Sequence, residues 1–271
     1  MKKSIVVFLT ILAVLALFAG CGSGGNDGAM LLQEGKLLVG TDPGYPPFQY
    51  INEESGEIDG FEVELAEMIG EKLGLEVEFV ENGFDAIFVG LDSMKYDCIL
   101  SAVSMTNDRM ENYLFTTPHL ANGQVIVVKP GDTSIQSHED LTGKKVGVQF
   151  ETTSDHACQK QLEAGLEFEL IKYDSIDQAF LAMRSEKVEC IVVDMGVALD
   201  YCTAYPEFYE MSSVALTNEP ISICIKKDNT ELQAAIQGAM DEIIAEGALS
   251  ELCIKWLGDD FTQDINTELT E

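Results

Sequence analysis

The chain has 271 residues, which is enough for one large domain or two of ordinary size. Apolar residues make up 46% of it, so it can bury a packed core and does not have the composition of a disordered protein. The formal net charge of -31 would repel nucleic-acid phosphates and excludes nucleic-acid binding. The same charge suits both general solubility and the attraction of a cationic ligand, and charge alone does not separate the two.

The N-terminus has the pattern of an export signal. Lys2 and Lys3 precede an apolar run from Ser4 to Ala19, which is shorter than the ~20 residues of a membrane-spanning helix. Ala19-Gly20-Cys21 then resembles the lipobox of bacterial lipoproteins, in which the cysteine becomes the lipidated N-terminus. We therefore expect a signal peptide over residues 1–20 and a lipid anchor on Cys21 with a flexible tether over 21–35. An ordinary signal peptide with an incidental cysteine is the alternative.

Strands and helices alternate along the next hundred residues. Residues 36–40 form a short apolar strand, followed by a turn-rich loop over 41–48. The spacing of Leu65, Ile69 and Leu73 predicts a helix over 61–73 that ends at Gly74. A strand at 77–80, a helix at 86–93 and a strand at 98–100 follow. This alternation favours α/β layers with mostly parallel sheets.

A second unit of the same plan is expected beyond residue 122. Residues 92–100 and 184–192 are similar, since each reads as a helix end, a turn with a lysine and a buried strand. Extended apolar runs at 124–129 and 221–226 suggest that the chain crosses into a second lobe and returns. We predict lobe 1 over residues 36–121 and 218–262 and lobe 2 over 122–217. An amphipathic helix around 232–243 and a polar tail over 263–271, expected to fray, complete the chain.

Six cysteines remain besides Cys21. No C-x-x-C spacing is present, so neither a zinc site nor a redox motif is predicted, and we expect no metal and no cofactor. Cys98 and Cys190 occupy buried strand positions and are expected to be free, because cysteine there behaves as a small hydrophobe. Export permits disulfides, and the pairing of Cys158, Cys202, Cys224 and Cys253 stays open.

Arg109 is the first candidate site residue. It follows the strand at 98–100 and lies in the first turn of a helix that Thr106 caps. Ligands of open α/β sheets bind at the carboxyl ends of strands, and the planar guanidinium suits a carboxylate. A solvated or structural arginine is the alternative.

Three further features lie at strand ends. Thr153 opens a helix, whose free N–H groups attract anions, although simple capping by Thr152 or Thr153 is the alternative. Asp194 follows the apolar strand 190–193 and suits an ammonium group or a helix cap. Tyr45 and Phe84 are aromatic residues that either flank a ligand or pack in the core.

Taken together, the chain resembles the bacterial extracellular solute-binding proteins of family 3, which serve amino-acid ABC transporters. The resemblance extends over nearly all of residues 36–258. The segments that carry it are Gly40-Thr41-Asp42 through Pro47-Phe48, Gly60 to Leu65, Thr106 to Arg109, Asp140 to Val148, Thr152-Thr153 and Val193-Asp194. It implies the two-lobed type II periplasmic-binding fold, with two crossover strands at a hinge.

The resemblance also implies roles for the site residues. Arg109 and Thr153 would hold the α-carboxylate of an amino acid, and Asp194, the Ser104 hydroxyl and the Ala102 carbonyl would hold its α-ammonium. Tyr45 and Phe84 would flank the side chain, with Asp42 near its far end. Glu151 departs from the family, which usually has glycine there; its acid either favours a cationic ligand at the cleft rim or points into solvent.

The function that follows is capture of a free L-amino acid outside the cytoplasm by hinge closure. The expected partners are a permease with its ATPase and, through the lipid, the cell membrane, and the protein itself is expected to be a monomer. The acidic residues favour Lys, Arg, ornithine or His as ligand, and glutamine stays open. The alternatives are a dehydratase-like enzyme on the same scaffold, for which Glu151, Asp42 and His156 are the acid or base candidates, and a sensory lobe. We expect no catalytic activity, since no nucleophile and base pair is evident.

Overall fold

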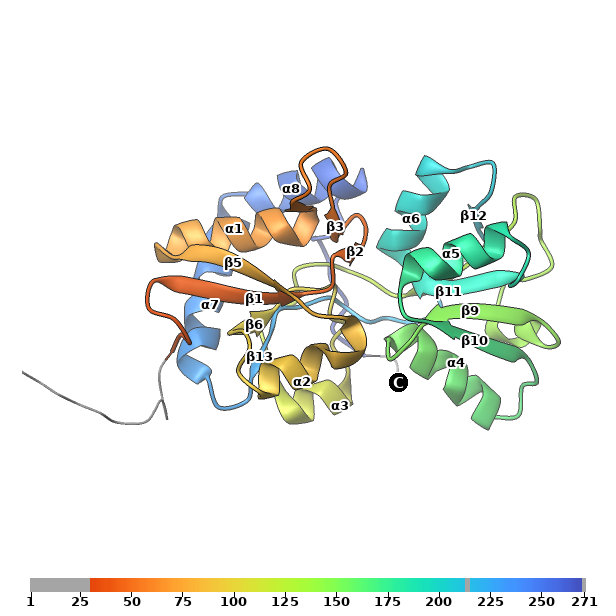
Figure 1. Ribbon diagram of the computed structural model, residues 1–271, viewed down its shortest axis with the longest axis horizontal. Coiled ribbons are helices and arrows are strands. Elements are labelled where there is room, and N and C mark those ends of the chain that lie inside the picture. The colour runs from red at the N-terminus through yellow and green to blue at the C-terminus, as the bar shows by residue number, and fades with distance from the viewer. Residues whose placement is uncertain (1–29, 213–214, 270–271) are drawn as a thin grey trace, which may run out of the picture.

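The computed structural model describes residues 30–212 and 215–269, which form two α/β lobes joined side by side (Figure 1). The leader, the tether and Cys21 lie outside these residues. Within the described part of the chain, no helix has the length and apolar character needed to cross a membrane.

The first lobe is built on a five-stranded sheet with the order β5-β1-β6-β13-β7. β1 runs parallel to β5 and β6, whereas β13, which comes from the returning chain, is antiparallel to its neighbours. These strands are β1 (Lys36–Thr41), β5 (Glu76–Glu81), β6 (Cys98–Ile99), β7 (Tyr113–Phe115) and β13 (Cys224–Lys226).

Helices cover both faces of this sheet (Figure 1). On one face α1 packs against α7 and α8, and on the other α2 packs against β1 and β13. The helices of this lobe are α1 (Phe61–Leu73), α2 (Ile87–Asp92), α3 (Asn107–Asn112), α7 (Thr230–Ala245) and α8 (Ala248–Leu257). A small antiparallel sheet of β2 (Gly44–Tyr45), β3 (Gln49–Ile51) and β4 (Ile58–Asp59) and the short 3-10 turn η1 (Phe84–Ala86) adjoin the second lobe.

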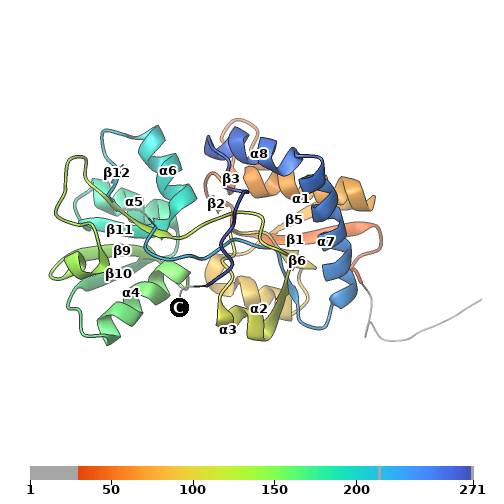
Figure 2. The same ribbon diagram turned by 180° about the vertical axis from the view of Figure 1, so that it is seen from behind.

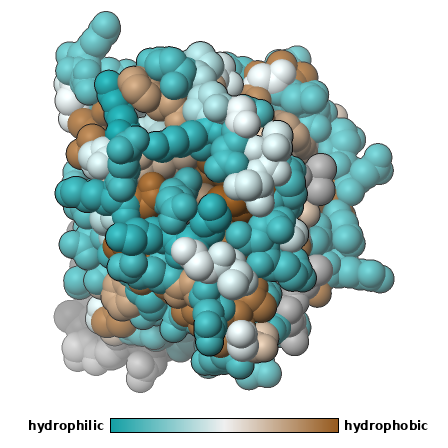
Figure 3. All heavy atoms as spheres, turned by 90° about the vertical axis from the view of Figure 1, so that its right-hand side faces the viewer, coloured by the Kyte–Doolittle hydropathy of each residue, from teal (hydrophilic) through white to brown (hydrophobic). Residues whose placement is uncertain are grey.

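The second lobe repeats this plan with the strand order β10-β9-β11-β8-β12. β10, β9 and β11 are parallel, and β8 is antiparallel to β11. Its elements are β8 (Gln124–Val128), η2 (His138–Leu141), β9 (Lys145–Gln149), α4 (Thr153–Glu163), β10 (Glu169–Tyr173), α5 (Ile176–Arg184), β11 (Cys190–Asp194), α6 (Met195–Ala204) and β12 (Glu210–Met211). On its outer end, hydrophilic side chains cover most of the surface (Figure 3).

Local sequence explains why helix α1 forms and ends where it was predicted. Leu65 and Ile69 are buried on its inner face, and Gly74 adopts a left-handed conformation with φ 67° just beyond it. The N–H of Gly74 bonds back to the carbonyl of Glu71, which satisfies a carbonyl at the helix end. The predicted alternation of strands and helices is therefore confirmed here.

Two antiparallel crossovers connect the lobes and lie side by side (Figure 2). Ile221 N–H donates to the carbonyl of Leu120 over 2.9 Å, and Glu219 N–H donates to that of Asn122 over 3.0 Å. Since each crossover is hydrogen-bonded to the other, the hinge behaves as a two-stranded ribbon.

The polar tail differs from the expectation that it frays. Its first residues lie against the hinge, where Ala121 N–H donates to the carbonyl of Phe261 over 2.8 Å. Farther on, the amide of Asn218 donates to the carbonyls of Asn266 (2.9 Å) and Glu268 (2.7 Å). The tail, dark blue in Figure 2, descends between the lobes because the crossovers offer donors to its backbone.

The cysteines of the described residues are all free. Cys98 in β6 and Cys190 in β11 are fully buried, as the sequence predicted. Burial raises the pKa of the Cys98 thiol well above its usual value, so it remains a neutral core residue.

Candidate ligand-binding site

A small pocket lies between the lobes, where β1, β6, β9 and β11 end. The eight residues that the sequence predicted all line it: Asp42, Tyr45, Phe84, Ala102, Ser104, Arg109, Thr153 and Asp194. Gln49, Ser101, Gln149 and Thr152 line it as well and were not predicted. The pocket has the position expected for a ligand site of an open α/β sheet.

Arg109 supplies the cationic wall. The N-cap Thr106 accepts from the Arg109 N–H and starts α3, and the guanidinium donates to the Ser104 carbonyl over 2.9 Å. The guanidinium carbon lies 5.7 Å from the ring centre of Phe84 and 4.9 Å from that of Phe88. Burial lowers the pKa of Arg109 from its very high usual value, and the group stays charged. No carboxylate of residues 30–212 or 215–269 forms an ion pair with it.

Asp194 supplies the anionic wall, at the end of β11. It accepts hydrogen bonds from the Tyr45 hydroxyl, the Asn122 amide and, over 2.8 Å, the Gln124 amide. Burial raises its pKa to about 6, and these donors oppose the rise. The carboxylate is thus surrounded by donors and lies on a pocket wall, an arrangement that suits an ammonium group.

The N-terminus of α4 faces the same pocket. Thr152 is the cap, since its hydroxyl accepts from Asp155 N–H over 3.3 Å. Thr153, the first helical residue, is therefore not needed as the cap, and its hydroxyl accepts from the Gln124 amide over 3.0 Å. The unpaired N–H groups of this first turn create a local positive potential that favours an anion.

Asp42 lies where β1 ends. Its carboxylate accepts from the Phe84 N–H over 3.2 Å and from the Gln149 amide over 3.1 Å. Burial raises the pKa of Asp42, because the charged form loses hydration. The Gln149 contact crosses from lobe 2 to lobe 1, so this acid is at the junction of the two lobes.

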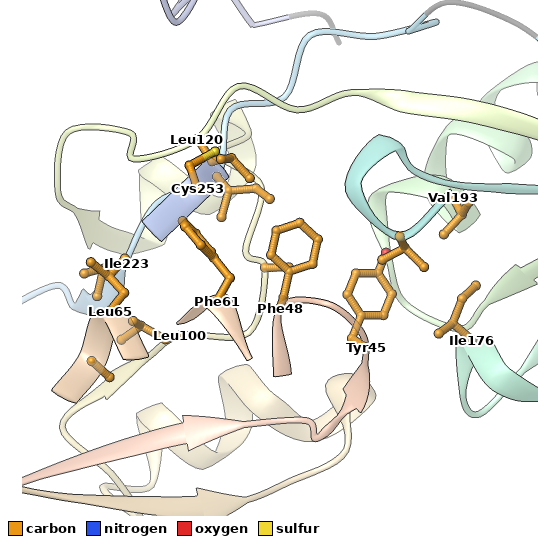
Figure 4. Packing of buried hydrophobic residues seen from close by; sticks show 14 of the residues in the cluster. Tyr45, Phe48, Phe61, Leu65, Leu100, Leu120, Ile176, Val193, Ile223 and Cys253 are labelled. Carbon is orange, nitrogen blue, oxygen red and sulfur yellow. The ribbon is translucent and has the colours of Figure 1, made fainter. Parts of the chain in front are cut away.

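The lobes are closed on each other. Tyr45 of lobe 1 packs among Ile176 and Val193 of lobe 2 (Figure 4), and its hydroxyl reaches Asp194. Phe48 lies directly against Gly196 at the start of α6. The structure therefore shows the conformation in which both lobes contribute to one pocket.

Ala102 and Glu151 have left-handed backbones, with φ 49° and 61°. Ala102 lines the pocket, and its N–H donates to the buried Glu62 carboxylate. Glu151, at the position where glycine is usual, does not line the pocket. Its side chain is 47% exposed and lies 3.6 Å from His156.

The residues that sequence reasoning missed are mainly amides. Gln149 ends the apolar run of β9, and that position was itself a signal, because a polar residue at a strand's carboxyl end faces the cleft. The crossovers contribute Asn122, Gln124 and Glu219. Their sequence pattern is mainly extended and apolar, so these polar side chains were not predicted. Gln124 connects Thr153, Asp194 and Glu219 through one amide.

The arrangement suits the two ends of a zwitterion. A guanidinium without a carboxylate partner and a buried carboxylate share one small pocket, and each comes from a different lobe. Only a closed molecule presents both groups to one ligand. No cluster of three metal-binding side chains occurs in the described part of the chain.

Residues 37–259 match the family model of the bacterial extracellular solute-binding proteins, family 3. The L-cystine-binding protein TcyJ of Escherichia coli is 30% identical over 85% of this chain and 86% of its own length. An ancestral arginine-binding protein solved with arginine is 36% identical, with a TM-score of 0.79 over 83% of this chain and 99% of that one. The ancestral amino acid-binding protein AncCDT-1, a precursor of cyclohexadienyl dehydratase, is 30% identical, with a TM-score of 0.76 over 82% and 96%.

An ancestral arginine-binding protein solved with glutamine is 37% identical, with a TM-score of 0.78 over 84% of this chain and 100% of that one. The match covers both lobes, the crossovers and each strand end that lines the pocket. This chain belongs to the bacterial extracellular solute-binding proteins of family 3, with their two-lobed type II periplasmic-binding fold.

Proposed function

We propose that this protein binds a free L-amino acid between its lobes, outside the cytoplasm, and delivers it to the permease and ATPase of an ABC transporter. The observation that carries the proposal is Arg109, a charged guanidinium that no carboxylate of the described residues neutralises, in one pocket with Asp194. Amino acids carry the complementary pair of charges. The L-cystine-binding and arginine-binding relatives agree with this class of ligand.

In this proposal each end of the ligand meets groups of opposite charge. Arg109 and the N-terminus of α4 at Thr153 hold the α-carboxylate. Asp194, the Ser104 hydroxyl and the Ala102 carbonyl hold the α-ammonium, and Tyr45 and Phe84 flank the side chain. Because the two lobes contribute different groups, ligand binding shifts the hinge toward the closed state.

A cationic side chain is the preferred one, as in lysine, arginine, ornithine or histidine. Asp42 supports this preference. It is an acid that lines the pocket, and burial has removed part of the hydration of its carboxylate. A cation beside it would restore a favourable electrostatic environment. The net charge of -31 supports the same preference over longer distances.

Binding without turnover is favoured over a dehydratase-like reaction, despite the likeness to the precursor of a dehydratase. An enzyme needs an acid or base directed at the substrate. Of the candidates, Glu151 and His156 pair with each other at the exposed rim and do not line the pocket. Asp42 accepts two hydrogen bonds that hold its carboxylate in place. Incubation with amino and keto acids should therefore yield no product.

Attachment to the cell membrane through a lipid on Cys21 completes the proposal, with a monomeric domain on the tether over 21–35. Labelling of cells with a radioactive fatty acid tests it: the label should enter the protein and be lost in Cys21→Ser. Label that persists in the variant would contradict the anchor.

Calorimetric titration with amino acids tests the central assignment. Arg109→Ala should weaken ligand binding by at least about tenfold, because the α-carboxylate would lose a charged hydrogen-bonding partner. Arg184→Ala, at the other arginine of the chain, exposed on α5, is the matched control and should bind normally. An Arg109→Ala protein with unchanged affinity would refute the role of Arg109, and a wild-type protein that binds no amino acid would refute the proposed function.

A further inference from the structure

Two buried acceptor atoms in the pocket lack a donor. They are the side-chain oxygens of Gln149 and Gln49, in residues that are 2% and 1% exposed, and no N–H or O–H of the described residues donates to either. Both residues line the ligand pocket. A buried acceptor that loses its hydration without gaining a donor destabilises the protein, and native proteins contain few of them. Two in one pocket indicate that a bound molecule supplies the donors.

The amide of Gln149 can lie only one way round. Its nitrogen donates to the Asp42 carboxylate over 3.1 Å and to the Asp174 carbonyl over 3.4 Å. Both partners are acceptors only, so rotating the amide would place its oxygen against two other oxygens. The Gln149 oxygen can therefore accept a hydrogen bond only from a donor other than these two partners.

The acceptors surround the end of the pocket at Asp42. Gln149 touches Asp42 directly, and Gln49 and the Asp42 N–H share the hydroxyl of Ser101, at 3.3 Å and 3.0 Å. Gln49 comes from β3, Asp42 from the end of β1 and Gln149 from β9 in the other lobe. The side chains of Gln49, Asp42 and Gln149 thus reach one end of the pocket from three different elements, and the two amide oxygens there have no donor among the described residues.

We propose that Gln149 is a specificity-determining residue, which with Gln49 and Asp42 selects ligands whose side chain ends in several N–H donors and a positive charge, as a guanidinium or an alkylammonium does. The inference rests on the proposed function and deepens it. An apolar side-chain end would leave both amide oxygens unsatisfied, and a side-chain carboxylate would be repelled by all three groups.

Gln149 also connects side-chain recognition with closure. Its hydrogen bond to Asp42 joins residues 107 positions apart and spans the cleft. A cationic side-chain end at this place meets Asp42 in either state of the hinge but meets Gln149 only after closure. The protein therefore discriminates between ligand side chains mainly in its closed state.

Calorimetric titration of the purified full-length protein with L-arginine and with L-norleucine, which lacks side-chain donors, tests the inference. The wild-type protein should bind arginine at least about tenfold more tightly than norleucine. Gln149→Leu should weaken arginine binding by at least about tenfold and leave norleucine binding unchanged or stronger. Gln136→Leu, on an exposed loop of the same lobe, is the matched control and should behave as the wild type.

Other results would overturn the inference. If Gln149→Leu weakens both ligands equally, the residue has only a structural role, and if it weakens neither, the acceptor is satisfied by water. Gln49→Leu carries the same expectation and serves if Gln149→Leu does not fold, as judged by its thermal midpoint. A wild-type protein that binds norleucine as tightly as arginine would refute the selectivity while the proposed amino-acid binding stands. A protein that binds neither these nor any other amino acid would refute both.

Discussion

Asp194 carries a carboxylate that is costly to bury in the protein. The residue is 5% exposed, and its carboxylate accepts hydrogen bonds from Tyr45, Asn122 and Gln124. A pKa of about 6, against a usual 3.8, means that burial in the folded, ligand-free protein penalises the charged form relative to the unfolded chain. The stabilisation from protonation is fully present below pH 3.8 and is lost as the pH rises through 6.

Asp194→Asn should therefore stabilise the ligand-free protein at pH 7.5, by about 1–3 kcal/mol. The variant amide can keep the existing contacts, since its oxygen can accept from Asn122 and Gln124 while its nitrogen donates to the Tyr45 oxygen. The gain should shrink toward pH 4, and ligand binding should be lost.

Urea unfolding at pH 5 and 7.5 measures this effect. Asp228→Asn is the control, because its side chain is 76% exposed, and it should change stability little at either pH. If Asp194→Asn is less stable than the wild type at pH 7.5, the cost of burying this charge has been misjudged.

At the scale of elements, helix α6 of one lobe lies close against the loop before β3 of the other. A Cβ atom on Gly196, in the first turn of α6, would lie 2.6 Å from Phe48 Cζ. Phe48 cannot move aside, because it is fully buried between Tyr45 and Phe61, with ring centres 6.1 Å and 6.3 Å away. The absent side chain at Gly196 thus allows the lobes to meet.

Gly196→Ala should weaken ligand binding by about tenfold or more, since the clash arises in the closed state and overpacking costs about 1–3 kcal/mol. Calorimetry measures the affinity, and small-angle X-ray scattering measures the compaction caused by ligand. Gly238→Ala is a suitable control, because this glycine lies in helix α7 with no atom within 4 Å of an added Cβ. Unchanged affinity in Gly196→Ala would show that closure does not require this contact.

At the scale of the whole molecule, the C-terminal tail adds a third segment across the hinge. It is held at Ala121 by the carbonyl of Phe261 and at Asn218 by the carbonyls of Asn266 and Glu268. Leu269 then lines a second cavity together with His156 and other residues of lobe 2. Since the tail begins in lobe 1 at α8 and reaches lobe 2, it contacts both bodies that the hinge moves.

Deletion of residues 263–271 should favour opening, because it removes the tail's contacts with Asn218 and the part of the tail that reaches lobe 2 at Leu269. We expect ligand affinity to fall by about threefold or more, which corresponds to the loss of a single net hydrogen bond. Scattering of the ligand-free protein should show a larger radius of gyration. Asn112→Ala, which removes an exposed amide on α3, should alter neither property, and a deletion variant identical to the wild type would show that the tail is passive.

Much of this structure could be predicted from interactions between residues that are neighbours in the sequence. The spacing of Leu65 and Ile69 and the glycine at position 74 define α1, because helical periodicity and a left-handed end are properties of neighbouring residues. The sequence also placed Arg109, Thr153 and Asp194 at the pocket, because each follows a strand whose carboxyl end opens on the cleft. The ordered motifs also indicated the family that the comparison confirmed.

Tertiary structure alone decided which side chains meet across the cleft. Tyr45 and Asp194 are 149 positions apart and Asp42 and Gln149 are 107 apart, and no local pattern specifies either pair. The sequence predicted that the polar tail frays, because the tail has no apolar face of its own. It is held instead by hydrogen-bond donors of the distant crossovers. Such contacts depend on the geometry of closed lobes, where a backbone or amide group finds its partner only after both sheets have formed.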